Sequence, residues 1–172
     1  DPIANPAVTT TYHVAVSDGF TTINPQVTVT VNAIPATPTI TASGPTIFCA
    51  GGSVTLTSSA GTSYLWSNGA TTQSINVTTS GTYTVKVTNA SGCQSAASAA
   101  TLVTVNALPL TPTITSGGPT TFCAGGSVTL TSSAESSYLW SNGATTQSIN
   151  VTTSGSYSVI VINASGCQSA PS

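Results

Sequence analysis

Charged side chains are nearly absent from this sequence. Of its 172 residues only one is Lys or Arg and three are Asp or Glu, which gives a formal net charge of −2, whereas an ordinary domain has about a quarter charged residues. A basic surface for nucleic acid cannot be built from a single lysine, and neither can an electrostatic membrane anchor. Solubility therefore has to rest on hydroxyls and amides, which suits an immobile, glycosylated or polymerised protein.

Methionine is also absent, and leucine, glutamate, lysine and arginine are scarce. Because these residues favour helices, the sequence gives almost no support to a helical fold. No run approaches the roughly 18 apolar residues that a membrane-spanning helix needs, so we expect no membrane insertion. The chain starts within a polar segment with no signal peptide before it, and we expect it to be an excerpt or a processed form.

What the sequence does contain is a long internal repeat. The stretch Pro45–Cys93 recurs 74 residues later as Pro119–Cys167, with 42 of 49 positions identical. Such a period predicts small repeated modules. A module of this size buries only about 60% of the surface that its unfolded chain exposes, so it needs additional stabilisation.

Short alternating stretches of apolar and polar residues, separated by turn signals such as Asn68–Gly69, run through each repeat. A tryptophan on the third stretch, Trp66, and a Gly-x-Tyr-x-Val around Tyr83 are typical of an immunoglobulin-like sandwich. The predicted fold is therefore all-β, with tandem immunoglobulin-like β-sandwich modules. In the first repeat we predict strands over residues 38–43, 53–58, 63–67, 74–78, 82–88 and 99–105, with at most a short edge strand at 70–73.

Two segments that each contain two prolines, residues 33–38 and 107–112, mark the junctions between modules. They divide the chain into three predicted parts. Residues 1–33 are the C-terminal strands of a partial module, residues 34–106 are a complete module, and residues 107–172 are a module that lacks its last strand.

The opening part of the chain repeats the later strands of a module. Its Val29–Asn32 has the same four residues as Val103–Asn106. The alternation of Tyr12, Val14 and Val16 predicts a strand with one buried face.

The second repeat has no equivalent of Val103–Asn106 after Cys167. Without this strand an edge stays open alongside Tyr157–Ile162. Either further protein follows, or another subunit supplies the strand by strand addition. The expected partners are therefore neighbouring modules of the same or another copy of the chain, and the second alternative makes the chain a candidate homopolymer.

Four cysteines, Cys49, Cys93, Cys123 and Cys167, take the same two places in each repeat, which is typical of structural disulfides in an oxidising compartment. The simplest pairs are Cys49–Cys93 and Cys123–Cys167. In an immunoglobulin-like sandwich these positions lie at opposite ends of a module, about 20 Å apart, whereas a disulfide needs Cα atoms within about 7 Å. The alternative is a Cys49–Cys167 bond between modules, which leaves Cys93 and Cys123 for neighbours; free thiols are the third possibility.

Asn-x-Ser/Thr sequences occur at candidate glycosylation sites. Chance matches are expected in a chain so rich in serine and threonine, and O-glycans on hydroxyls are an alternative suggested by the near absence of charge. The four sites are Asn76, Asn89, Asn150 and Asn163.

No catalytic, metal or cofactor site is predicted. Histidine occurs once, at His13 on the outward face of a strand, and neither repeat contains aspartate. A nucleophilic serine needs a positioned base and an orienting acid, and calcium needs clustered carboxylates. We expect the chain not to be an enzyme and to use no cofactor. The main aromatic residues are predicted to lie in the core rather than on a sugar-stacking surface: Trp66, Trp140, Tyr83 and Tyr157.

The motifs Cys-x-Gly-Gly-Ser-Val-x-Leu, Tyr-Leu-Trp-Ser-Asn-Gly-Ala-Thr-Thr-Gln-Ser-Ile and Ser-Gly-x-Tyr-x-Val-x-Val, followed by Gly-Cys, together resemble a known type of repeat. They are similar to the Ig-like or PKD-like repeats of large secreted and cell-surface proteins of Bacteroidota, such as gliding-motility adhesins and type IX secretion cargo. The resemblance covers nearly all of residues 34–172. It implies an extracellular or cell-surface spacer or adhesive stalk and leaves the ligand open.

We therefore predict a structural extracellular protein, a repeat stalk, filament or adhesin spacer. The alternative is an adhesive binding module that recognises a surface glycan or protein through its loops. A binding module should vary its tip loops between copies. Here the loop Trp66–Ser74 is identical to Trp140–Ser148, which favours the spacer.

Overall fold

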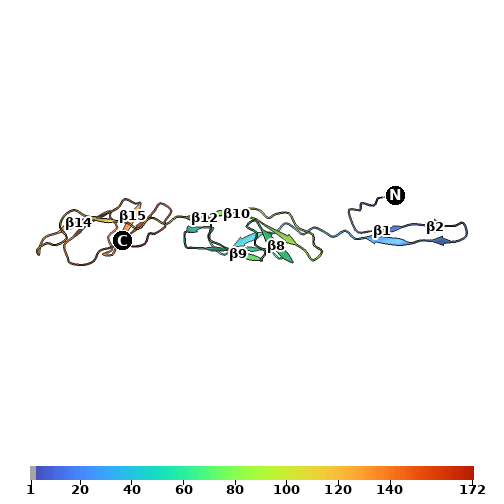
Figure 1. Cartoon of the computed structure of the whole chain (residues 1–172), viewed down its shortest axis with the longest axis horizontal. Helices are drawn as coiled ribbons and strands as arrows, with labels where there is room; N and C mark the ends of the chain where they lie inside the picture. The colour runs from blue at the N-terminus through green and yellow to red at the C-terminus, as the bar shows by residue number, and fades with distance from the viewer. Residues whose placement is uncertain (1–2) are drawn as a thin grey trace. The chain divides into compact units, whose positions relative to one another are not determined.

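A computed structural model describes residues 3–172, which form strands, turns and loops and contain no helix (Figure 1). The all-β class predicted from the sequence is confirmed. The chain divides into two compact units, one with residues 3–44, 55–77 and 81–102 and the other with residues 45–54, 78–80 and 103–172. The predicted module boundaries at residues 34 and 107 stay a prediction.

The opening part of the chain is a hairpin-like ribbon. Strand β1 (Thr10–His13) pairs antiparallel with β4 (Gln26–Val29), and β2 (Val16–Ser17) pairs with β3 (Thr22–Ile23). The expectation of one buried face is wrong here, because Val14 is 58% and Val16 is 49% exposed. Both sheets have only two strands, and a ribbon without a covering layer cannot bury either face.

The first repeat forms three groups of paired strands in the order β5-β7-β9, β8-β11 and β10-β12-β6. Strands β10 and β11 follow each other along one segment. Because β11 pairs with β8 and β10 pairs with β12, this segment joins β8 and β12, as in the two-sheet order of an immunoglobulin-like sandwich. The bounds are β5 Ile40–Ala42, β6 Ile47–Cys49, β7 Val54–Ser58, β8 Ser63–Trp66, β9 Ser74–Val77, β10 Gly81–Tyr83, β11 Val85–Thr88 and β12 Thr101–Asn106.

Two features of this repeat differ from the predicted strands. Strand β6 was not predicted, and it pairs in parallel with β12. The single strand predicted over 82–88 is interrupted at Thr84, whose N–H donates to Ser67 Oγ at 3.2 Å while its carbonyl accepts from Ser67 N at 2.8 Å. A side-chain oxygen thus replaces a ladder partner at this point, and the strand is divided into β10 and β11.

Buried residues of the first repeat come from alternate positions of these strands, as the period of two predicts. The indole of Trp66 is 2% exposed, and its Nε1–H donates to Thr72 O at 2.8 Å. This hydrogen bond therefore ties the loop after β8 to the buried indole. The buried apolar residues are Val54, Leu56, Trp66, Ile75, Val77, Tyr83, Val85, Val87 and Val103.

The second repeat forms two of the three groups, β13-β14-β16 and β15-β17. Its core contains Val128, Trp140, Ile149, Val151 and Val159. Within the described residues it has no counterpart of β12, and the segments that correspond to β6 and β10 are not strands. In the first repeat β12 is the middle strand of its group and pairs with both β10 and β6. The bounds are β13 Ile114–Ser116, β14 Val128–Ser132, β15 Ser137–Trp140, β16 Ser148–Val151 and β17 Val159–Ile162.

Candidate functional site

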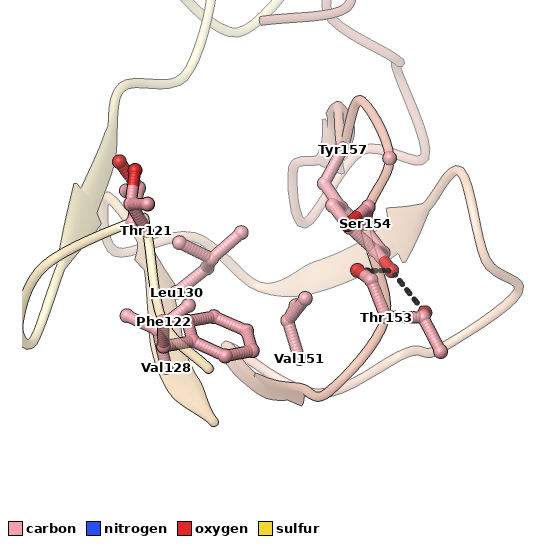
Figure 2. A pocket seen from close by; sticks show the side chains of 10 residues that line it. Thr121, Phe122, Val128, Leu130, Val151, Thr153, Ser154 and Tyr157 are labelled. Atoms are coloured by element: carbon pink, nitrogen blue, oxygen red, sulfur yellow. Dashed lines mark hydrogen bonds between the residues drawn. The ribbon is translucent and has the colours of Figure 1, made fainter. Parts of the chain in front are cut away.

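An open cavity of about 430 Å³ lies in the second repeat at the place that corresponds to β12 in the first repeat. Thr121 and Phe122 lie on one side of it and Ser154 and Tyr157 on the other, with Leu130 between them (Figure 2). On the far side the Tyr157 hydroxyl is held by Thr153, at 3.0 Å from Thr153 Oγ1 and 3.1 Å from its carbonyl. The cavity therefore has an apolar floor and two backbone walls that no strand bridges.

The corresponding place in the first repeat is occupied by β12. Val105 N donates to Ser80 Oγ at 2.8 Å, and Thr104 N donates to Thr46 O at 2.8 Å. Next to these bonds, the register of β12 with β6 places Asn106 opposite Cys49. Ser80 and Thr46 correspond to Ser154 and Thr120, both of which line the cavity. The acceptor groups for a strand are thus present in the second repeat.

Burial of the lining residues differs from burial of their counterparts in the first repeat. Leu56 is fully buried and Tyr83 is 8% exposed, whereas their counterparts Leu130 and Tyr157 are only half-buried. Phe122 is 36% exposed. Leu56 and Tyr83 are thus removed from water beside β12, whereas their counterparts keep part of their contact with water.

The position of the open edge differs from the predicted one. We predicted it alongside Tyr157–Ile162, but residues 168–172 run along most of that segment. Ser169 N donates to Val161 O at 2.9 Å, and Ser172 N donates to Val159 O at 3.1 Å. Residues 168–172 form no strand of their own beyond the bridge between Gln168 and Ile162, yet they cover β17, so the open part is confined to residues 155–157 and 120–123.

The four cysteines form one bond and leave two thiols. Cys49 is joined to Cys167, with sulfurs 2.01 Å and Cα atoms 5.6 Å apart, which is ordinary disulfide geometry. Cys93 is half-buried with a free thiol, and Cys123 is exposed with a free thiol. The alternative with Cys49–Cys93 and Cys123–Cys167 is therefore not formed, because the disulfide links the two copies of the repeat.

Each repeat holds the chain segment before it through the same contacts. Asn163 Nδ2 donates to Ala107 O at 3.0 Å, and Cys167 Sγ lies 4.0 Å from Asn106 O. In the same way Asn89 Nδ2 donates to Ala33 O at 2.8 Å, and the Cys93 thiol lies 3.7 Å from Asn32 O. The repetition of the asparagine and cysteine positions is the single signal in the sequence that points to these contacts.

The candidate glycosylation sites fall into two kinds. Asn76 and Asn150 are exposed on β9 and β16. Asn89 and Asn163 are half-buried, and their Nδ2 atoms donate to the junction carbonyls described above. An N-glycan is attached at this nitrogen, so modification would compete with the junction at the second pair. Glycosylation stays a prediction at all four positions.

Among the remaining predicted residues, His13 is exposed at the end of β1 opposite Gln26. Both tryptophans lie in the core at 2% exposure, and Tyr157 departs from the predicted core position because it borders the open cavity. No group of three or more His, Cys, Asp or Glu residues gathers within residues 3–172. The same residues include no helix long and apolar enough to cross a membrane.

Comparison of the chain with models of known protein families finds no match, and comparison with curated proteins finds none either. Among solved structures, the human OSCAR ligand-binding domain is similar over 82% of this chain and 99% of its own, with 14% identity and a TM-score of 0.35. An adhesin described as Ca²⁺-stabilized, which helps an Antarctic bacterium bind ice, is similar over 96% of this chain, with 19% identity and a TM-score of 0.47. The chain spans 55% of that adhesin structure. Both likenesses are too loose to carry an argument about function.

Proposed function

We propose that this chain is a structural extracellular protein, a spacer or stalk segment made of immunoglobulin-like β-modules rather than an enzyme. The single observation that carries the proposal is the joint that is built twice. Asn89 with Ala33, and Asn163 with Ala107, make the same hydrogen bond at the same point of each repeat. A spacer requires a joint of constant geometry, because its length is set by the number of repeats.

The tip loops support a spacer over a receptor. In both copies the indole N–H is used internally, from Trp66 to Thr72 O and from Trp140 to Thr146 O, each at 2.8 Å. An indole committed to its own loop cannot donate to a ligand. The two loops are therefore the same rigid turn, whereas recognition loops are expected to differ between modules.

An extracellular location is supported by the disulfide Cys49–Cys167, since such bonds persist in oxidising environments. The scarcity of charge fits a protein that is fixed in place, with a surface made of Ser and Thr hydroxyls. The similarity to repeats of Bacteroidota surface proteins, and secretion by a type IX route, stay predictions from the sequence motifs.

The function is tested by adhesion of the purified chain to glycan arrays and bacterial or host cell surfaces. The matched variant replaces Thr71, Thr72, Thr145 and Thr146 with alanine, which changes both tip loops and leaves the core. A spacer gives the same background retention for both proteins. Retention of the original chain that the variant loses would instead show a binding module that acts through its loops.

A further inference from the structure

The outward face of the sheet formed by β15 and β17 is not used by a spacer function. We propose that this face of the second repeat binds the same face of a second copy of the chain, so that two copies associate through it. The contact is apolar and is made by Leu139, Ile160 and Ile162, which we call the apolar face. This association does not depend on whether the chain acts as a spacer.

The apolar face is the place where the two repeats differ in character. Seven of 49 aligned positions differ, and three of the seven exchange Thr for Ser. Two positions have an apolar residue where the first repeat has a polar one: Ile160 stands in place of Lys86, and Ile162 in place of Thr88. Both isoleucines belong to β17 and are separated by one residue, so they lie on one face of the sheet. The second repeat is thus a near copy of the first with isoleucines added to this part of its surface.

The strand register brings a leucine beside the isoleucines. Leu139 of β15 lies opposite Ile160 in the antiparallel pair. The alternate residues Trp140 and Val161 are 2% and 0% exposed and face the core, so Leu139 and the isoleucines face away from it. Leu139 is 42% exposed, and Ile160 and Ile162 are half-buried. Neither strand contains a charged residue.

Strand order, and not the position of either end of the chain, leaves this face open. In the first repeat, the following strand β12 pairs with β10 and β6, and Leu65, the counterpart of Leu139, is 46% exposed. In the second repeat, the hydrogen bonds from residues 168–172 reach backbone groups of Val159 and Val161. Such bonds lie in the plane of a sheet and not over its face.

Charge selects a second copy of the chain as the partner. The net charge is −2 over 172 residues, so two copies repel each other little. A partner that presents a charge to the apolar face would lose hydration without gaining an opposite charge. The first repeat of another copy is disfavoured for this reason, because it presents Lys86 beside Leu65. The apolar face of another copy has no such group, and two sheet faces pack about 10 Å apart with interdigitated side chains.

A charged residue at the end of the sheet sets the orientation of the two copies. Glu135 lies two residues before β15, and its side chain is exposed. Its backbone N–H donates to the Tyr138 hydroxyl at 2.8 Å, and its carbonyl accepts from that hydroxyl at 3.0 Å, which fixes its place. Two such carboxylates repel each other at the same end of a contact. The β15 strands of the two copies therefore run antiparallel, with the two Glu135 residues at opposite ends.

The test measures self-association of the full chain by sedimentation velocity. The protein concentration runs from about 10 µM to about 1 mM, the range that suits a small, weak interface. Every protein carries Cys93→Ser and Cys123→Ser, which remove the free thiols, so oxidation cannot produce a dimer. The sedimentation coefficient should rise with concentration toward that of a dimer. Because the contact is apolar, the rise should be the same at about 50 mM and about 500 mM NaCl.

The first repeat supplies the matched variants, because it folds with polar residues at the same places. Ile160→Lys with Ile162→Thr gives the second repeat the face of the first and should weaken association at least about tenfold. Lys86→Ile with Thr88→Ile makes the opposite change. It gives each copy two apolar faces and should produce species larger than a dimer. Tryptophan fluorescence checks that each variant is folded, because both indoles are buried.

Two further measurements identify the face that makes the contact. Leu139→Ser should weaken association, whereas the matched change Leu65→Ser should leave it unchanged. In NMR spectra, the amide shifts of residues 137–140 and 159–162 should change with protein concentration, and those of residues 63–66 and 85–88 should stay constant. The NMR measurement needs no substitution in either face.

The proposal is overturned if the sedimentation coefficient does not change up to about 1 mM. It is also overturned if the chain with Ile160→Lys and Ile162→Thr associates as strongly as the original. Equal losses from Leu65→Ser and Leu139→Ser would indicate a contact between unlike repeats and would overturn it as well. Constant amide shifts at residues 137–140 and 159–162 would have the same meaning.

Discussion

At the scale of single residues, serine takes the role that charge has in other proteins. Several serines lie beside a strand and make two bonds to one partner residue. Ser95 N donates to Val87 O at 2.9 Å while Ser95 Oγ accepts from Val87 N at 3.0 Å. Ser98 makes the same two hydrogen bonds with Val85. Ser169 repeats the pattern with Val161. The serine hydroxyl accepts the hydrogen bond that a carbonyl of a neighbouring strand would otherwise accept, so buried strand amides are satisfied without ionic groups.

Asp18 gives the residue-scale prediction. Its Oδ1 accepts from Thr21 N at 2.7 Å and from Phe20 N at 2.9 Å, and these bonds hold the pKa of this carboxyl below its ordinary value of 3.8. A lowered pKa stabilises the turn above the ordinary value, and this contribution is lost as the pH falls through the lowered pKa. The Phe20 and Thr21 amide shifts in NMR spectra should titrate with a midpoint below 3.8.

The matched control for this turn is Asp18→Asn. Its amide oxygen can still accept both bonds but does not ionise, so the two amide shifts should then be independent of pH over the same range. A midpoint at or above the ordinary carboxyl value in the original chain would contradict the prediction.

At the scale of elements, the Ser80 hydroxyl accepts a backbone hydrogen bond from β12. Ser80→Ala removes the acceptor of Val105 N and should lower the free energy of unfolding by about 1 kcal/mol. Ser154→Ala makes the same chemical change beside the empty cavity, where no strand lies. It should change the stability of the monomeric chain by less than about 0.5 kcal/mol. Urea unfolding followed by tryptophan fluorescence measures both, and equal losses would contradict the difference in strand content.

The positions of most strands could be predicted from the sequence, because apolar alternation and turn residues are local signals. Three features could not. Strand β6 is short and depends on a parallel partner far along the chain, and the break at Thr84 depends on the Ser67 hydroxyl across a strand pair. The exposure of Val14 and Val16 depends on the absence of a covering layer. Of the candidate site, the hydrogen bonds from residues 168–172 to β17 could not be predicted, because nothing local in the sequence indicated them.

At the scale of the whole chain, the disulfide can be tested with trypsin. The sequence has one Lys or Arg residue, Lys86, so cleavage gives two fragments. The bond Cys49–Cys167 joins these fragments until it is reduced. Cys93→Ser should therefore leave them joined, whereas Cys167→Ser should release them. The opposite result for the two variants would indicate the pairs Cys49–Cys93 and Cys123–Cys167, and mass spectrometry without reduction distinguishes the cases.

The same bond has a mechanical consequence. When the two ends of the chain are pulled, tension enters at one cysteine and leaves at the other, so the 118-residue separation between Cys49 and Cys167 carries no force. At up to about 3.6 Å per residue, roughly 400 Å of chain is removed from the possible extension. Residues in that interval can still unfold on heating, but pulling on the two ends of the chain cannot extend them. The length of the chain under load is then set by the disulfide and by the segments outside residues 49–167.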